Sequence, residues 1–206
     1  MKNIDNIALM IQDGVVSEVQ CCQSPFLKNI QTNGHIEFVF LQFKDDLDVQ
    51  IQLTEKGSSC NVKCAYFGAE TQKLNINIDI THHAPETKSE QTVKGLLTDS
   101  AQASFSGIIR IPYHSQKCEG YQNHRALLLS DNAKSESIPE LEIYADNVKC
   151  SHGSAIGPLD KSQLFYLLSR GIDEKSAYKI LISAFILDLV PQAYQSVVQE
   201  WIDEHI

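Results

Sequence analysis

The sequence predicts a mainly β protein that ends in a small helical subdomain. Two observations predict this fold class. From Ile7 to about Cys150 the apolar residues alternate with polar ones, which is the period of a β-strand. After Gly157 they recur every three to four residues, which is the period of an α-helix. We therefore expect residues 1–158 to form a β body and residues 159–206 a helical subdomain.

The strands are short and are separated by turns rich in Gly, Asn, Asp and Ser. The first two form a hairpin, because Asp13-Gly14 between Ile7–Gln12 and Val15–Gln20 supplies the positive-φ pair of a type I′ turn. Leu74–Ile80 has the cleanest alternation. The other expected strands are Ile36–Leu41, Val49–Leu53, a strand through Cys60 and Cys64, Val93–Leu97, Phe105–Ile111, Ala126–Ser130, Leu141–Tyr144 and Val148–Cys150. No fixed sequence repeat is visible, and the period alone does not choose between a sandwich, a barrel and a β-solenoid.

Three helices are expected after the β body. Asp160 and Gln163 form a start that resembles a capping box, and Gly171 supplies the residue that commonly ends a helix. Asp173 caps the second helix, and Pro191 opens the third. The expected apolar stripes are Leu164, Leu167 and Leu168; then Ala177, Ile180, Leu181, Ala184 and Phe185; and finally Tyr194, Val197, Val198, Trp201 and Ile202.

Composition narrows the function classes. The formal charge of −9 argues against nucleic acid or an anionic membrane as the main partner. No apolar run reaches the roughly 18 residues that span a bilayer, and the first residues do not read as a secretion signal, so we expect a cytoplasmic protein. In that compartment the six cysteines are expected as thiols. Cys60 and Cys64 share a strand face as core residues, whereas Cys21 and Cys22 point to opposite faces.

The junction between the β body and the helices is the most specific stretch. It contains Leu141–Gly157, with Lys-Cys-Ser-His-Gly at positions 149–153, followed by Gln163–Leu167 and Ser169–Ile172. This stretch closely resembles the end of the SufB/SufD family core, and the Lys-Cys-Ser-His-Gly segment is similar to SufD rather than SufB. Gln116-Lys117 and Leu127–Ser130 fall where that family has related blocks.

The resemblance implies a right-handed parallel β-helix with a C-terminal helical subdomain, in a member shortened at its N-terminus. It implies a non-enzymatic component of the SUF system of iron–sulfur cluster assembly. Such a component pairs through its β-helix with a SufB-like subunit or a second copy of itself, and docks the ABC-type ATPase SufC through its helices. The docking residues that carry over are Gln163, Leu164, Phe165, Tyr166, Ser169, Arg170, Gly171 and Ile172.

The resemblance also implies a metal-handling role for His152, with Cys150 two residues away. At i and i+2 on a strand, the two side chains project to the same face, and thiolate with imidazole suits iron. A cluster needs about four ligands, so the others would come from a partner chain and the cluster would be transient, with no permanent cofactor. Alternatively, Cys150 fills the last rung and His152 caps the sheet by hydrogen bonding.

Other candidate sites have simpler interpretations. His82 and His83 are expected in a solvated turn, and the spacing of His114, Cys118 and His124 matches no ligand pattern. The sequence has no Walker lysine motif, dinucleotide fingerprint or nucleophile elbow, so we expect no enzyme. Two alternatives stay open: an adaptor that binds the ATPase but handles no iron or sulfide, and a β-solenoid polysaccharide enzyme, which the single Trp disfavours.

Overall fold

The structure is a computed structural model that describes residues 5–19, 26–30 and 34–206. Cys21 and Cys22 lie outside the described residues. The strands are β1 (Ile7–Gln12), β2 (Val15–Glu18), β3 (Phe26–Ile30), β4 (His35–Gln42), β5 (Leu47–Leu53), β6 (Ser59–Gly68), β7 (Lys73–His82), β8 (Lys88–Leu97), β9 (Gln102–Ile111), β10 (Glu119–Leu128), β11 (Lys134–Ile143) and β12 (Lys149–Gly157).

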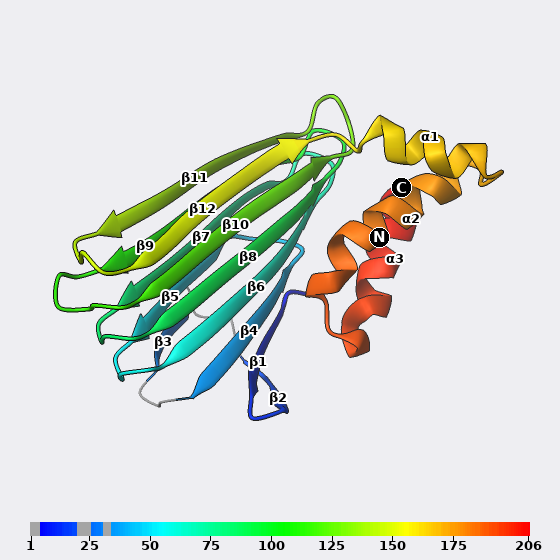
Figure 1. Cartoon of the computed structure of the whole chain (residues 1–206). Helices are drawn as coiled ribbons and strands as arrows, with labels where there is room; N and C mark the ends of the chain where they lie inside the picture. Colours follow the sequence, from blue (N-terminus) through cyan, green and yellow to red (C-terminus); the bar gives the residue numbers. More distant parts are fainter. Residues whose placement is uncertain (1–4, 20–25, 31–33) are drawn as a thin grey trace.

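These strands wind into a β-solenoid, which confirms the predicted fold class (Figure 1). Even-numbered strands from β4 to β12 pair in parallel in one layer, sheet A, whose order is β12-β10-β8-β6-β4-β1-β2. Odd-numbered strands from β3 to β11 pair in parallel in a second layer, sheet B, whose order is β11-β9-β7-β5-β3. Each turn of the chain therefore adds one strand to each layer.

Successive rungs of the solenoid are separated by a nearly constant number of residues, although the sequence shows no repeat. Ser59, Lys88, Glu119 and Lys149 occupy equivalent positions on successive strands of sheet A, 29, 31 and 30 residues apart. Because each rung stacks on the previous one in register, side chains of one column lie directly above one another. The register therefore decides which residues meet inside the solenoid.

The interior holds the apolar residues of each alternating strand. Ile76, Ile78 and Ile80 are all at most 1% exposed and point inward, as predicted. Cys60 and Cys64 are buried in the same core, also as predicted. Burial of these alternate positions is the main stabilising term of such a fold.

The strand boundaries differ from the prediction where the interior turns polar. The strand β3 was not predicted at all, and β10, β11 and β12 extend well beyond the expected segments. Their inward positions include Gln122, Ser137 and Ser154, so the apolar alternation stops before the strands do. The N-terminal hairpin is confirmed, with Asp13 at φ 50° and Gly14 at φ 78° in its turn.

The helices are α1 (Lys161–Ser169), α2 (Glu174–Ile186) and α3 (Gln195–His205), with the short 3-10 helices η1 (Leu187–Leu189) and η2 (Gln192–Tyr194) before α3. The two predicted aspartate N-caps are confirmed. Asp160 accepts a hydrogen bond from the Ser162 amide at 2.8 Å, and Asp173 accepts one from the Ser176 amide at 3.0 Å. Gly171 follows α1 at φ 83°. Pro191 precedes η2, so the regular helix α3 begins later than predicted.

Helices α2 and α3 pack on the outer face of sheet A. Trp201 lies 5.3 Å from the Phe67 ring, centroid to centroid, in a second apolar cluster that the helices share with the sheet. The Lys94 ammonium also donates to the Phe185 carbonyl oxygen at 2.8 Å and to the Asp188 carboxylate at 2.7 Å. The helical segment therefore shares a core with the solenoid, and the division at residue 158 into separate units stays a prediction.

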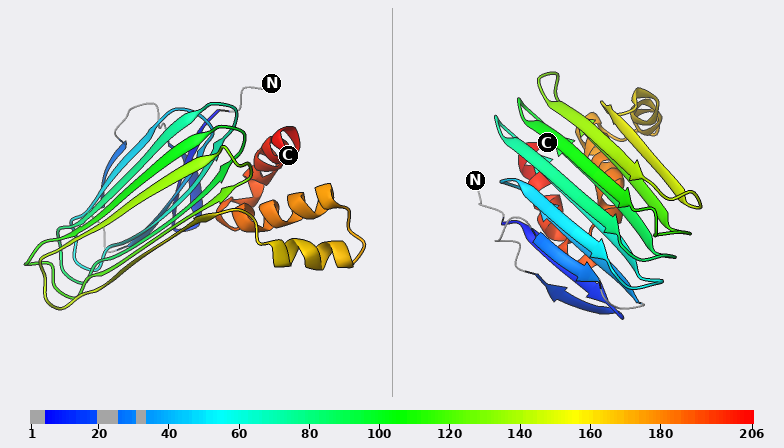
Figure 2. Two further views of the ribbon diagram at one scale, coloured as in Figure 1. Left: turned by 90° about the horizontal axis from the view of Figure 1, so that it is seen from above. Right: turned by 90° about the vertical axis from the view of Figure 1, so that its left-hand side faces the viewer.

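Two of the predicted helical stripes are wrong. None of the residues of α1 is buried, because this helix projects past the ends of the strands (Figure 2). On α2, Ala177 is buried as predicted, but Ile180 is 47% exposed and the sheet covers Ile182 and Ile186 instead. Both α1 and one side of α2 therefore present apolar residues to solvent.

Candidate functional site

The terminal rung brings Cys150 and His152 to the open end of the solenoid. Strand β12 pairs with β10 in the described part of the chain and has no strand on its other side (Figure 1). Its register places Cys150 beside Gly120 and His152 beside Gln122. Since Gly120 and Gln122 are buried, both β12 residues project toward the inner side of the sheet, as their spacing predicts.

Cys150 is half-buried against an apolar cluster that includes Ile109 and Ile111. Burial raises the pKa of the Cys150 thiol, and a hydrogen bond with the Gly120 backbone only partly opposes this effect. A raised pKa disfavours the thiolate, which is the form that binds metal. The free chain therefore presents Cys150 mainly as a packed thiol.

His152 is exposed. Within residues 5–19, 26–30 and 34–206 no hydrogen-bond partner is found for its ring, so the structure gives no support to a hydrogen-bonded cap of the sheet. An exposed imidazole on an edge strand is accessible to a second protein chain. A ligand role for His152 stays a prediction.

His82 corrects the prediction of a solvated turn. It is the last residue of β7, is fully buried, and lies 2.7 Å from the Thr87 hydroxyl and 2.8 Å from the Ser89 hydroxyl through its two ring nitrogens. Burial lowers the pKa of His82 to about 4. His83 is exposed, as predicted. Continuing the alternation of β7 by one step would have placed His82 inside.

His124 and Cys118 are buried and His114 is exposed, so these three residues do not gather. The His124 ring stacks on Phe105 at 4.6 Å between centroids, and its Nε2 lies 2.9 Å from the Tyr66 hydroxyl oxygen. Burial lowers the pKa of His124 to about 4. Among the described residues, no three His, Cys, Asp or Glu side chains are placed to share one metal ion.

The predicted docking residues lie on and just after α1, at the end of the molecule away from β2 (Figure 1). Phe165 and Tyr166 are 72% and 56% exposed, and Leu168 is 38% exposed. The Arg170 guanidinium carbon lies 5.2 Å from the centroid of the Tyr166 ring. The remaining predicted residues, Gln163, Leu164, Ser169, Gly171 and Ile172, are exposed or partly exposed.

Residues 28–185 match the protein-family model for the SUF system FeS cluster assembly, SufBD core domain. This match covers the solenoid from β3 onward together with α1 and most of α2. The chain belongs to the SufBD family. Members of this family are components of iron–sulfur cluster assembly rather than known catalysts.

Individual SufBD relatives match over most of this chain. The chain is 33% identical over 138 residues to the iron–sulfur cluster assembly protein SufD of Escherichia coli K12, which covers 67% of this chain and 33% of that protein. It is 40% identical over 129 residues to a SufBD family protein of Synechocystis, covering 61% and 28%. The SufD of Bacillus subtilis is 31% identical over 134 residues, covering 65% and 31%.

The matched region spans about a third of the length of these SufBD relatives. In the part of the chain that the structure describes, no helix has the length and apolar character needed to cross a membrane.

Proposed function

We propose that this SufBD chain is a SufD-like, non-enzymatic component of the SUF complex. It pairs through the open end of its solenoid and docks an ABC-type ATPase through α1. The observation that carries the proposal is the exposure of α1, whose Phe165 and Tyr166 side chains are mostly in solvent. Exposed aromatic residues grouped on one helix are typical of a protein interface, where such residues supply most of the binding energy.

The surroundings of α1 favour a large partner. Ile180 on α2, which contacts α1, adds a further apolar side chain at 47% exposure. The Lys94 contacts with Phe185 and Asp188 hold α2 to sheet A, so a partner bound at α1 would be fixed relative to the solenoid.

A double substitution tests docking. Phe165→Ser with Tyr166→Ser should weaken binding to a purified SufC-type ATPase at least tenfold, because two exposed anchors are lost. The matched control is Tyr113→Ser with Tyr144→Ser, since these aromatic residues are 71% and 67% exposed at a corner of the solenoid. Isothermal titration calorimetry measures both.

The α1 variant should melt within about 2 °C of the wild type, because neither side chain is buried. Equal affinity of the α1 variant and the wild type would refute docking at α1. An equal loss of affinity in both variants would show that the effect is not specific to α1, and would also contradict docking there.

The open end of the solenoid is the proposed pairing surface. Strands β11 and β12 end sheets B and A, and an exposed edge strand is a template for pairing with another chain. A partner that adds strands there would cover Cys150 and His152 and could bring its own thiolates to them. In this proposal the cluster is cargo assembled between the two chains, with His152 as one ligand.

His152→Ala separates the ligand role from the adaptor alternative. The substitution should lower the iron bound by the anaerobically reconstituted complex, while unfolding stability changes by less than about 0.5 kcal/mol because His152 is exposed. Ser151→Ala on the same strand is the control. Normal iron content with normal stability would favour the adaptor, which binds the ATPase without handling iron. A stability loss of about 1–3 kcal/mol would instead indicate a structural cap.

A further inference from the structure

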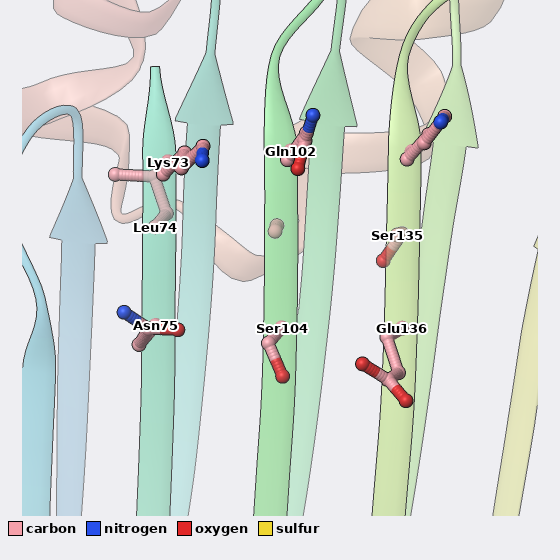
Figure 3. Close-up of a pocket in the computed structure, with 9 residues that line it drawn as sticks. Lys73, Leu74, Asn75, Gln102, Ser104, Ser135 and Glu136 are labelled. Atoms are coloured by element: carbon pink, nitrogen blue, oxygen red, sulfur yellow. The ribbon is translucent and has the colours of Figure 1, made fainter.

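The outer face of sheet B carries a hollow of about 370 Å³ at the start of three neighbouring strands, β7, β9 and β11. Figure 3 shows the side chains that line it, and those of its outward-facing positions form two rows across the three strands. This hollow lies on the outer face of sheet B, and one of its three strands, β11, is also the edge strand of sheet B at the proposed pairing surface.

The first row consists of Lys73, Gln102 and Lys134, which are in register on the three strands. Neighbouring strands lie about 4.8 Å apart, so the backbones of Lys73 and Lys134 flank that of Gln102 at about that distance on each side. Neither lysine has an ion-pair partner among the described residues. By contrast, Lys63 and Lys149 on sheet A each pair with a carboxylate, at 2.8 and 2.9 Å.

The second row consists of Asn75, Ser104 and Glu136. The Asn75 side-chain amide donates a hydrogen bond to the Asp46 carboxylate at 3.0 Å, so this nearby carboxylate already has a partner. The Ser104 hydroxyl stays available beside Gln102. Glu136 is the one carboxylate that lines the hollow, and its negative charge weakens the binding of an anion there.

We propose that the hollow binds an oxyanion group, either a phosphate or a carboxylate. Both unpaired ammonium groups attract an anion seated between them, and the Gln102 amide and the Ser104 hydroxyl can donate hydrogen bonds to its oxygens. A chain with a net charge of −9 repels anions at long range, so binding is weak and sensitive to salt. The ligand is a small oxyanion or an acidic side chain of a partner.

Amide NMR of the full chain tests the site. Inorganic phosphate, and separately succinate, is titrated at constant ionic strength, with sodium chloride as the reference. Saturable shifts should be confined to the hollow, around Lys73, Gln102, Ser104 and Lys134. Stronger binding of phosphate would identify a phosphate ligand, whereas stronger binding of succinate would identify carboxylates such as those of an acidic segment.

Charge-matched variants decide the result. Lys73→Gln with Lys134→Gln should weaken binding about tenfold, since each exposed ion contact contributes about three- to fivefold. Lys161→Gln with Lys175→Gln makes the same change of net charge on the helices and should leave binding unchanged. Glu136→Gln should tighten phosphate binding by removing a like charge. Shifts that equal those of chloride, equal losses in both lysine variants, or weaker binding by Glu136→Gln would overturn the site.

Discussion

Acidification from pH 7 to pH 5 should destabilise this protein through two buried histidines. His82 and His124 are fully buried, and burial lowers the pKa of each to about 4, from an ordinary value of 6.5. The folded state therefore keeps both rings neutral, whereas the unfolded chain takes up protons as the pH falls through 6.5. The contribution of the two neutral histidines to stability is fully present above pH 6.5 and is lost as the pH falls toward 4.

The size of the effect follows from the two pKa values. Between pH 7 and pH 5, the protonation of each unfolded histidine should remove about 2 kcal/mol, and the pair about 4 kcal/mol. That loss is a large part of the roughly 5–15 kcal/mol that stabilises a typical domain. Carboxylates titrate mostly below this range, so the two rings dominate it.

Urea unfolding followed by circular dichroism at half-unit pH steps measures the loss. His82→Asn and His124→Phe should each reduce the pH slope by about half, even if the variants are less stable overall. His114→Gln is the control, because His114 is exposed and lies 3.0 Å from the His83 carbonyl oxygen. A slope that stays at the wild-type value in both buried-histidine variants would refute the reasoning.

Two further substitutions test how the core is packed. Gly95→Ala should destabilise the solenoid by about 3 kcal/mol, because a Cβ there would lie 2.0 Å from the Tyr66 ring. Calorimetry measures this loss, and adding Tyr66→Leu to the variant should recover part of it. Unchanged stability of Gly95→Ala would contradict the packing. Trp201→Ala should cost about 3–5 kcal/mol, because it removes the contact with Phe67 between α3 and sheet A. Ile180→Ala, on the exposed side of α2, should change stability by less than about 0.5 kcal/mol. Equal losses in chemical unfolding would contradict the observed burial.

Local chemistry specified the elements that need only neighbouring residues. The hairpin turn at Asp13-Gly14, the caps at Asp160 and Asp173 and the helix end at Gly171 each depend on a few adjacent atoms. The alternation around Ile76–Ile80 was equally clear, because the inward positions from Leu74 to Ile80 are all aliphatic. These features were readable from the sequence alone.

The polar interior was not readable in the same way. Gln91 and Gln122 are buried one above the other in neighbouring rungs, and Gly107 on the facing sheet leaves the space that the Gln122 amide occupies. A glutamine in a strand normally indicates the solvent face. Only stacking of distant segments shows that these residues point inward.

For the candidate sites, the sequence identified residues and the fold assigned their environments. The i, i+2 spacing placed Cys150 and His152 on one face, but their unequal exposure depends on β12 being the last strand of sheet A. The apolar residues of α1 looked like a buried stripe. They are exposed because the helix extends past the sheet, and helical periodicity does not say whether anything covers the apolar side.

By itself, the sequence determined that this protein has a strand-rich body, a helical end and a junction typical of the SufBD family. The period of two did not choose between a sandwich, a barrel and a solenoid, because all three show it, and only the family resemblance implied a solenoid. Tertiary structure made that choice by pairing residues such as Ser59, Lys88 and Glu119, about 30 positions apart. Strands pair through backbone hydrogen bonds, which do not depend on the identity of the side chains. The sequence therefore does not reveal which residues pair, and the register is seen only in the tertiary structure.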